Sequence, residues 1–407
     1  MSLDLNAAAR QIEALAEALR GRRQEWAASL GVALATLGGA DAGALQRKEE
    51  ESRRTFTFLA ARLVDGLAER HDPPSAPREY AALAVDGSHI DVDRHAPPRC
   101  FLINTGRVAL RYGASPDARL ESTPRLYAAP EELVLRDPQG TREVPIEGQL
   151  LGMVRTVAEL EALAGLCEEA PADAPTLALV DGSLVLWGLS GQAVPDFVRR
   201  ALLEGAPGAG GGLLPALGRV RRAAQGRRLA LAAYVSFPRS TEVTNLLRLA
   251  RCPYQRANCD HHCGHLATGA RPCDGVHGLA DRDVLGRWLG EGQRSAVFAS
   301  GSQVLEHYGE HRVHFFYVNV GPEVARVEVP AWVAEEEALL GLAHALVLDQ
   351  CRRGQGYPVA LMEAHERAVV TGQDRELFRQ MVEQALVERG EAPSTSEKAR
   401  SKRVRWV

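Results

Sequence analysis

The first 70 residues carry apolar side chains at helical spacing. Ile12, Leu15 and Leu19 fall at positions i, i+3 and i+7, which places them in one stripe along a helix. The glycine-rich stretch 38–43 interrupts this pattern, and the proline-rich stretch 71–77 ends it. We therefore predict an N-terminal helical arm over residues 1–72, which packs either on the rest of the chain or on a second subunit.

From Tyr80 onward the pattern changes to short apolar runs that are typical of strands. Two of these runs, 82–85 and 177–180, are each followed by the sequence Asp-Gly-Ser. Asp-Gly is also a common hairpin turn, and for either copy alone that interpretation is equally good. Because two copies each close an apolar strand, we predict that the carboxylates of Asp86 and Asp181 converge on one cation site.

The remaining pattern alternates between strands and helices, which predicts an α/β fold. Strands are predicted at 99–104, 106–112, 229–237, 312–320 and 324–329, and helices at 151–167, 241–250, 335–352 and 358–389, the last with Gly372 as a candidate interruption. The main domain is predicted to span residues 80–375. Residues 376–407 form the end of the last helix and a basic tail, which contains Lys398, Arg400, Lys402, Arg403 and Arg405.

Composition narrows the classes of function. The net charge of −4 excludes a uniformly basic surface, so any nucleic-acid contact has to come from local patches. One candidate patch contains five arginines between residues 219 and 228, which form either a solvated helix face or a phosphate contact. The glycine-rich stretch 205–212 before it lacks the Gly-Lys-Ser/Thr ending of a phosphate loop, and we interpret it as a surface loop. No apolar run reaches the roughly 18 residues of a membrane helix, and no secretory signal is present, so we expect a cytoplasmic protein without membrane contact.

Four of the seven cysteines lie in one stretch, residues 252–273. In a reducing compartment, clustered cysteines bind metal more often than they form disulfides. Cys252, Cys259, Cys263 and Cys273 are therefore candidate ligands of a structural zinc ion or an iron–sulfur cluster. No Cys-x-x-Cys pair is present, so plain loop cysteines remain an equal alternative.

The order of these elements resembles the ribonuclease-H-like fold, a mixed sheet flanked by helices, here with a helical arm and a cysteine-rich insertion. More specifically, the sequence resembles the NurA family of DNA-repair nucleases over about residues 80–375. The matching segments are Val85-Asp86-Gly87-Ser88, Val180-Asp181-Gly182-Ser183, Tyr234-Val235-Ser236, Gly356-Tyr357-Pro358 and Glu363-Ala364-His365-Glu366-Arg367-Ala368.

The resemblance implies a set of site residues. Asp86 and Asp181 match the metal-binding aspartates of the family, and Tyr357 and His365 match its C-terminal tyrosine and histidine. The family also uses a glutamate between the two aspartates, for which we choose Glu159, with Glu161 as a rival. Considered alone, His365 is more simply a surface or hydrogen-bonded histidine, and Tyr357 a packing residue. Carboxylates together with a histidine suit Mn²⁺ or Mg²⁺, and a pair of such ions roughly 4 Å apart can hold a scissile phosphate.

The resemblance further implies what the protein does. It implies 5′-to-3′ exonuclease and single-strand endonuclease activity on DNA ends in double-strand-break repair. It also implies a homodimer and a partner, a HerA-type hexameric ATPase. Two alternatives remain: a non-catalytic DNA-binding or scaffold protein of the same fold, and a related nuclease acting on RNA or branched DNA.

Overall fold

The chain folds into two units in this computed structural model, which describes residues 4–91, 99–190, 194–267 and 269–390. Unit 1 comprises Met1–Pro73, Val235–Ser302 and His314–Val327, and unit 2 comprises Pro74–Tyr234, Gln303–Val313 and Glu328–Val407. This division differs from the predicted one. Residues 235–302 and 314–327, which we assigned to the domain at 80–375, group with the N-terminal residues instead.

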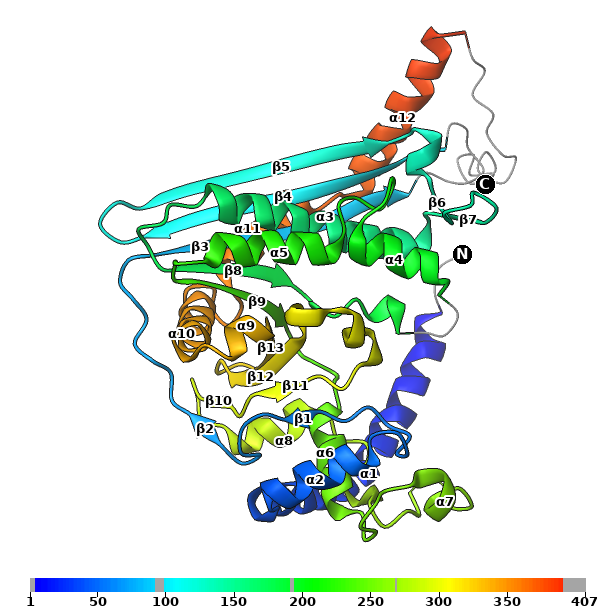
Figure 1. The fold of residues 1–407 in the computed structure, drawn as a ribbon. Coiled ribbons are helices and arrows are strands. Elements are labelled where there is room, and N and C mark those ends of the chain that lie inside the picture. The colour runs from blue at the N-terminus through cyan, green and yellow to red at the C-terminus, as the bar shows by residue number, and fades with distance from the viewer. Residues whose placement is uncertain (1–3, 92–98, 191–193, 268, 391–407) are drawn as a thin grey trace. The chain divides into compact units, whose positions relative to one another are not determined.

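Unit 2 contains the Asp-Gly-Ser sequences and the helices predicted to surround them (Figure 1). Its strands are β3 (Tyr80–Asp91), β4 (Phe101–Tyr112), β5 (Asp117–Tyr127), β6 (Val134–Arg136), β7 (Glu143–Pro145), β8 (Thr176–Asp181) and β9 (Leu229–Val235). Its helices are α3 (Gly148–Glu169), α4 (Asp196–Glu204), α5 (Leu213–Ala224), α9 (Ala331–Ala334), α10 (Glu337–Arg353), α11 (Val359–Ala368) and α12 (Gly372–Glu388). Its short 3₁₀ helices are η1 (Pro130–Glu132), η2 (Trp187–Leu189), η4 (Gln303–His307) and η5 (Gly309–His311). The tail Ser394–Val407, predicted to be basic and mobile, lies outside the described residues.

The sheet of unit 2 is mixed, and its strands follow the order β5-β4-β3-β8-β9. β3 pairs antiparallel with β4, and β4 pairs antiparallel with β5. β8 lies parallel to β3 on one side and parallel to β9 on the other. Every residue of β8 before Asp181 is buried, as is usual for parallel strands that are covered on both faces.

Helices cover both faces of this sheet. α3 packs on β3 and β4, and α5 packs on α3. Their apolar side chains form one core with alternate residues of β3, including Leu83 and Val85. α11 also contacts β3, β4 and β5, and it reaches β4 at Gly106, where an added Cβ would overlap the carbonyl oxygen of Ala364 in α11. Because alternate residues of a strand point to opposite faces, α3 and α11 lie on opposite faces of the sheet. The predicted mixed sheet with flanking helices is therefore confirmed.

Two strand predictions need correction. The segments 99–104 and 106–112 were predicted as separate strands, yet β4 runs unbroken from Phe101 to Tyr112. We predicted a break next to Gly106, but this glycine is paired within the sheet, and its lack of a side chain allows α11 to pack closely on β4. Likewise, β3 does not end at Asp86 but continues through the first Asp-Gly-Ser to Asp91. The hairpin-turn interpretation of that sequence is therefore wrong.

Unit 1 contains the N-terminal helices and several short strands. Its helices are α1 (Leu5–Gly39), α2 (Ala42–Ser52), α6 (Glu242–Arg251), α7 (Cys259–Cys263) and α8 (Asp281–Trp288), with the 3₁₀ helix η3 (Asp274–Val276). Its strands are β1 (Arg62–Leu63), β2 (Arg70–His71), β10 (Arg294–Ser295), β11 (Phe298–Ala299), β12 (Val313–Asn319) and β13 (Val324–Pro330). β1, β11, β12 and β13 are neighbours in that order. The division between the units cuts β12 after its first residue and β13 after Val327.

The predicted helical arm is helical only in part. α1 and α2 confirm the helical pattern up to Ser52. Of the later apolar positions, Leu63 belongs to β1, and Phe56, Leu59 and Leu67 lie in loops. Leu67 lies in the core of unit 1 together with Leu30, Leu37 and Leu45 from the two helices. The second half of α1 and all of α2 are therefore part of a folded unit rather than a free arm.

No single described helix is long and apolar enough to span a membrane. One bent pair, Arg23–Gly39 with Ala42–Ser52, meets the criterion only on length and composition, with a bend of 105°.

Candidate active site

Asp86 lies in the middle of β3, on the face that α11 covers. It is paired across the sheet with Gly106 of β4, and directly paired residues point to the same face. Gly106 has no side chain, so α11 lies directly on the backbone of β4; an added Cβ would come within 2.8 Å of the Ala368 amide nitrogen. α11 is therefore seated beside Asp86.

Two polar side chains anchor the C-terminal end of α11. Asn104 Nδ2 donates to the carbonyl oxygen of Ala368 at 3.0 Å, and Ser88 Oγ donates to the same oxygen. The last carbonyl groups of a helix have no partner within the helix, so these donors replace water there. The anchoring fixes where the side chains of α11 lie along β3 and β4.

His365, on the anchored helix, reaches Asp86. Its Nδ1 lies 2.8 Å from Asp86 Oδ2, while 61% of the histidine side chain stays exposed. The imidazole is therefore oriented by a carboxylate on one edge and open to solvent on the other. This is the arrangement that a proton-transferring histidine needs.

Asp181 is held by a tyrosine. The hydroxyl group of Tyr357 donates to Asp181 Oδ1 at 2.8 Å, and the Tyr357 ring packs edge-on against Tyr234, with centroids 5.3 Å apart. Gly182 follows with φ of +89°, a conformation that favours glycine, and its N–H donates to the Tyr234 carbonyl oxygen at 3.0 Å. Asp181 thus ends β8 at a sharp turn, which is where we predicted it.

Glu159 approaches the same place from the other face of the sheet. It comes from α3, is only 5% exposed, and lies directly against Gly87, where an added Cβ would be 2.5 Å from its Oε1. Arg155, one helical turn earlier, places its Nε 3.1 Å from Glu159 Oε1. The two Asp-Gly sequences therefore need glycine for different reasons: Gly182 for its positive φ, and Gly87 for the space that Glu159 fills.

The three carboxyl groups interact electrostatically. Burial, opposed by Arg155 and reinforced by the charges of Asp86 and Asp181, raises the pKa of Glu159 from 4.5 to about 8. Partial loss of hydration and the charge of Asp86 raise the pKa of Asp181, while the hydrogen bond from Tyr357 lowers it. Burial and the charge of Asp181 also raise the pKa of Tyr357, so this phenol stays protonated and continues to donate. The cluster therefore carries repulsion that a divalent cation would relieve.

The donor set fits such an ion. Glu159 Oε1 is buried, and apart from its ion pair with Arg155 it has no hydrogen-bond partner within the described residues. It lies in the field of Asp86 and Asp181, and the three groups offer only oxygen ligands, which Mg²⁺ and Mn²⁺ prefer. Asp86, Glu159 and Asp181, with His365 beside Asp86, are thus candidate ligands of a divalent metal.

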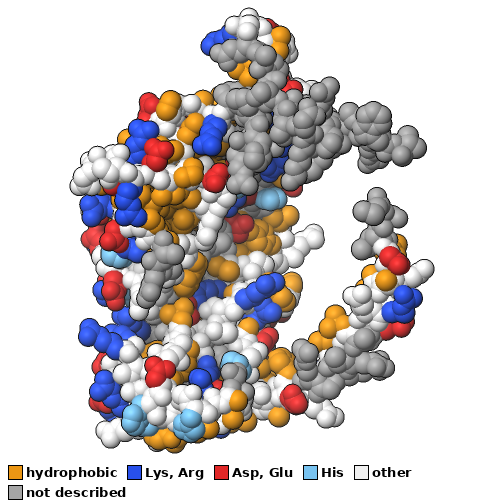
Figure 2. Space-filling model, turned by 90° about the vertical axis from the view of Figure 1, so that its right-hand side faces the viewer, with side chains coloured by type: hydrophobic (Ala, Val, Ile, Leu, Met, Phe, Trp, Pro, Cys, Tyr) orange, Lys and Arg blue, Asp and Glu red, His pale blue; other side chains and the backbone are white. Residues whose placement is uncertain are grey.

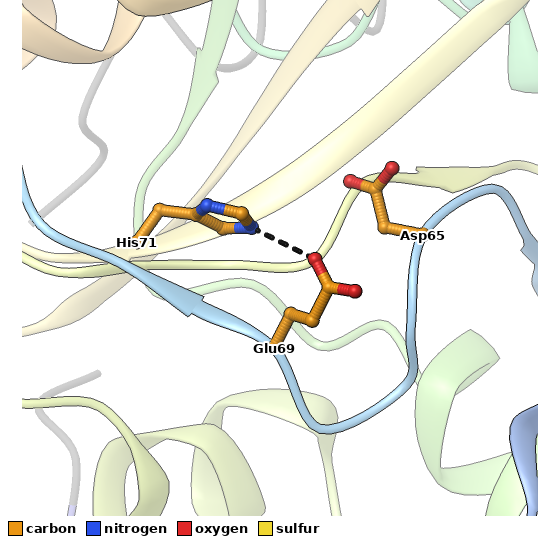
Figure 3. A group of neighbouring side chains, drawn as sticks. All are labelled: Asp65, Glu69 and His71. Carbon is orange, nitrogen blue, oxygen red and sulfur yellow. Dashed lines mark ion pairs between the residues drawn. The ribbon is translucent and has the colours of Figure 1, made fainter.

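A tighter group of potential ligands lies in unit 1. Within the described ranges, the one set of three ligand atoms closer than 4.8 Å to one another comes from Asp65, Glu69 and His71 (Figure 3). His71 Nε2 lies 3.3 Å from Glu69 Oε2, and Asp65 Oδ2 accepts from the Val297 amide at 3.0 Å. Arg294 lies in the field of both carboxylates, which oppose the lowering of its pKa by burial. Since the positive charge of Arg294 already balances the carboxylates of Asp65 and Glu69, we assign these side chains to the local structure of the loop rather than to a metal site.

The structure separates the two candidate glutamates. Glu161 Oε1 accepts a hydrogen bond from the backbone N–H of Gly211, in the glycine-rich stretch 205–212. Glu159 instead lies at Gly87 and in the field of the two aspartates. The geometry therefore favours Glu159, while Glu161 holds the loop that we interpreted as a surface loop.

Most of the arginines predicted as a phosphate-binding patch already have partners inside unit 2. Arg219 binds Glu168 through two nitrogens, and Arg221 pairs with Glu310. Arg227 donates to three backbone carbonyl oxygens, those of Cys167, Ala170 and Pro171. These three arginines therefore act within the fold rather than as free phosphate contacts, Arg219 and Arg221 on the face of α5 and Arg227 shortly after it.

The four clustered cysteines gather in unit 1 as free thiols. Cys259 and Cys263 begin and end α7, Cys252 directly follows α6, and Cys273 directly precedes η3. The pKa of both Cys263 and Cys273 is raised, mainly by burial and also by the charge of Cys252. In the part of the chain that the structure describes, no three sulfur atoms lie within 4.8 Å of one another. A metal at this loop stays a prediction.

Sequence reasoning missed the groups that shape the turn after Asp181. Glu328 Oε2 accepts from Ser183 Oγ at 2.7 Å and from the Leu184 N–H at 2.9 Å. The Tyr308 hydroxyl accepts from the Leu186 N–H at 2.9 Å. The sequence could have pointed to Glu328, because it is an acidic residue within a largely apolar strand, β13, which is fully buried. No feature of the sequence singles out Tyr308.

Comparison with known proteins finds one family that matches most of the chain. The family model of the NurA domain matches residues 80–370, more than half of the 407-residue chain. No curated protein matches the chain.

Proposed function

The chain belongs to the family of NurA-domain proteins, and from this premise we propose that it is a divalent-metal-dependent deoxyribonuclease. Membership of a nuclease-associated family gives the general class of activity. The observation that carries the finer proposal is the placement of three carboxylates at the paired strands β3 and β8: Asp86 bonded to His365, Asp181 bonded to Tyr357, and Glu159 against Gly87. We further propose that it acts as a 5′-to-3′ exonuclease and single-strand endonuclease that processes DNA ends in break repair.

Each residue has a proposed task. Asp86, Glu159 and Asp181 would hold the divalent cation, which when bound polarises the scissile phosphate and lowers the pKa of water. Tyr357 orients Asp181, since its protonated hydroxyl donates to one carboxylate oxygen and leaves the other free for the cation. His365 is oriented through Nδ1 by Asp86, so its other ring nitrogen can donate or accept a proton. A non-catalytic scaffold would have no use for this cluster of repelling carboxylates.

The strand order supports the ribonuclease-H-like assignment. Three antiparallel strands, β5, β4 and β3, continue into the parallel strands β8 and β9. Neighbouring strands β3 and β8 carry the two aspartates, the first helix after the antiparallel strands carries Glu159, and the late helix α11 carries His365. This is the distribution of site residues that we expect of that fold.

The test is cleavage of end-labelled linear DNA by the purified protein. We expect degradation with Mn²⁺ or Mg²⁺ and none with EDTA, and 5′- and 3′-labelled strands will report polarity. RNA and branched DNA of the same sequence serve as competing substrates. Absence of cleavage with every metal and every substrate, by a protein that still binds DNA, would favour the scaffold alternative.

We also propose that Cys252, Cys259, Cys263 and Cys273 bind a structural zinc ion or an iron–sulfur cluster. The position of the four thiols, on α7, directly after α6 and directly before η3, supports this proposal. Binding of the metal would require the sulfur atoms to move closer together. Thiolates held together repel one another unless a metal neutralises them. Elemental analysis and absorbance of protein purified without added metal are expected to show one equivalent of zinc, or iron with a visible band. Substoichiometric zinc and iron would contradict the proposal.

A homodimer and a HerA-type hexameric ATPase are the proposed partners. The N-terminal half of α1 supports self-association, because exposed apolar side chains recur along it at intervals of seven, three, four and seven residues. These residues are Leu5, Ile12, Leu15, Leu19 and Trp26. Figure 2 shows hydrophobic side chains on the surface of this face of the molecule. The spacing along α1 is that of a coiled-coil seam, which a second copy of the same helix would cover.

Charged substitutions in this stripe test the dimer better than deletion of residues 1–70, which would also remove core residues of unit 1. Ile12→Glu combined with Leu19→Glu is expected to convert the dimer to a monomer in sedimentation velocity, with Glu13→Ala as a control on the same helix. A double variant that sediments like the wild type would show that α1 is not the dimer contact.

A further inference from the structure

An exposed tryptophan lies close to the proposed site. Trp187 begins η2, six residues after Asp181, and 40% of it is exposed. Tryptophan is usually well buried because its large ring gains much from leaving water. An indole face open to solvent beside a cluster of carboxylates therefore needs an explanation.

The indole is held in place by a chain of hydrogen bonds. Its Nε1 donates to Ser183 Oγ at 3.0 Å, and this hydroxyl in turn donates to Glu328 Oε2 at 2.7 Å. Glu328 is 1% exposed, so the chain ends in the protein interior. Ser183 Oγ also accepts from the Val185 N–H at 3.0 Å, which fixes the turn itself. The ring is thus a preorganised flat surface rather than a mobile side chain.

The helix that carries Glu159 supports the turn. Gly188, directly after the tryptophan, is packed so closely on α3 that an added Cβ would overlap the sulfur of Met153 and lie 3.2 Å from Gln149 Nε2. The element that positions the tryptophan is therefore in contact with the element that positions the buried carboxylate.

Chain geometry limits the distance from Trp187 to Asp181. Ser183 is two residues from Asp181, and an extended chain spans at most about 3.6 Å per residue. Adding the serine side chain and the 3.0 Å hydrogen bond places the indole nitrogen within roughly 13 Å of the Asp181 Cα. That distance is comparable to one or two nucleotides of a single strand.

We propose that the exposed face of Trp187 stacks on a nucleobase next to the scissile phosphate and so makes the site select unpaired DNA. This inference rests on the proposed nuclease function. Stacking on an aromatic side chain contributes about 1–3 kcal/mol per base and tolerates any sequence, because every base has a flat face. Bases inside a duplex are already stacked and paired, so only a single strand or a frayed end offers this contact.

The first test compares Trp187→Ala with Trp187→Phe on single-stranded DNA. Loss of stacking is expected to raise KM roughly 5- to 150-fold for the alanine variant, the equivalent of 1–3 kcal/mol, with kcat little changed. The phenylalanine variant keeps a flat ring and is expected to recover most of the loss. Leu120→Ala is the control for the loss of an exposed apolar side chain, because Leu120 is 37% exposed but lies on the edge strand β5. An unchanged KM in a folded Trp187→Ala protein would overturn the inference while leaving the nuclease function standing.

The main result of the second test comes from the wild-type protein. Oligonucleotides with one abasic position, moved stepwise along the strand, are bound to the wild-type protein in EDTA, where no cleavage is expected. Affinity is expected to fall at one or two positions, and the same substitutions are expected to have no effect on Trp187→Ala. If the affinity of the wild-type protein does not depend on the position of the abasic site, stacking on Trp187 is contradicted. A position-dependent profile from a protein that never cleaves DNA would instead contradict the nuclease proposal and leave the stacking contact in place.

Discussion

Asp181→Asn is expected to abolish metal-dependent cleavage of DNA, with a loss of at least ~10³-fold, while the protein stays folded. Asparagine keeps the size of the side chain and one oxygen to accept the hydrogen bond from Tyr357, but it removes the charge that would hold the cation. Asp86→Asn is expected to behave in the same way. Because both aspartates would serve one metal centre, the double variant should be little worse than either single one.

A matched control for these variants is Asp173→Asn. Asp173 is exposed, belongs to unit 2, and pairs with Arg111 at 2.9 Å, away from the proposed site. It is expected to keep the wild-type rate. If Asp86→Asn and Asp181→Asn both degrade linear DNA as fast as this control does, the metal-nuclease proposal fails.

Glu159→Gln is expected to stabilise the metal-free protein at alkaline pH and to inactivate it at the same time. The folded protein raises the pKa of Glu159 from 4.5 to about 8, so the folded state holds this proton more tightly than the unfolded chain does. Stability from this group is complete below about pH 4.5 and is lost as the pH rises to about 8. Glutamine keeps the shape without the charge, so its advantage should grow over that window by about 1.4 kcal/mol per pH unit at most.

The measurement is thermal unfolding of both proteins in EDTA, in steps from pH 5 to pH 9, and again with Mn²⁺. The melting temperature of the wild type should fall relative to that of the variant as the pH rises, and Mn²⁺ should restore it for the wild type more than for the variant. Glu161→Gln, which alters the contact to Gly211, should show no such pH-dependent gain. Parallel melting curves at all pH values would mean that Glu159 ionises without cost and is not a buried member of the carboxylate cluster.

The sequence indicated the two aspartates as candidates because each is a lone charge in an apolar run. It also predicted the helices that carry Glu159 and His365, whose apolar spacing is regular, and the interruption noted at Gly372 is the start of a separate helix, α12. It did not distinguish the two Asp-Gly sequences, because a tight turn and a close helix contact both demand glycine. Only the tertiary structure shows that Gly87 makes room for Glu159, whereas Gly182 makes a turn.

Long-range organisation was less predictable. The apolar residues between Ser52 and residue 72 fit a helix by spacing, but they complete a core with segments more than 200 residues later, such as Val276. Nothing local in the sequence signals that pairing. The anchoring of α11 by Asn104 and Ser88 was invisible for the same reason, since each partner looks like an ordinary strand residue.

The different settings of the two aspartates have a consequence for how the site would tolerate ions of different radius. Asp86 lies inside a strand whose twelve residues are all in register with β4, so its Cα can move only if the sheet moves. Asp181 is the last residue of β8, next to a glycine, and it is restrained by its pairing with Tyr234 of β9 and by its side-chain bond to Tyr357. When the larger Mn²⁺ replaces Mg²⁺, Asp181 and its turn should therefore move more than Asp86 does. Tyr357→Phe, by loosening that side alone, is the change that should alter the preference between the two metals.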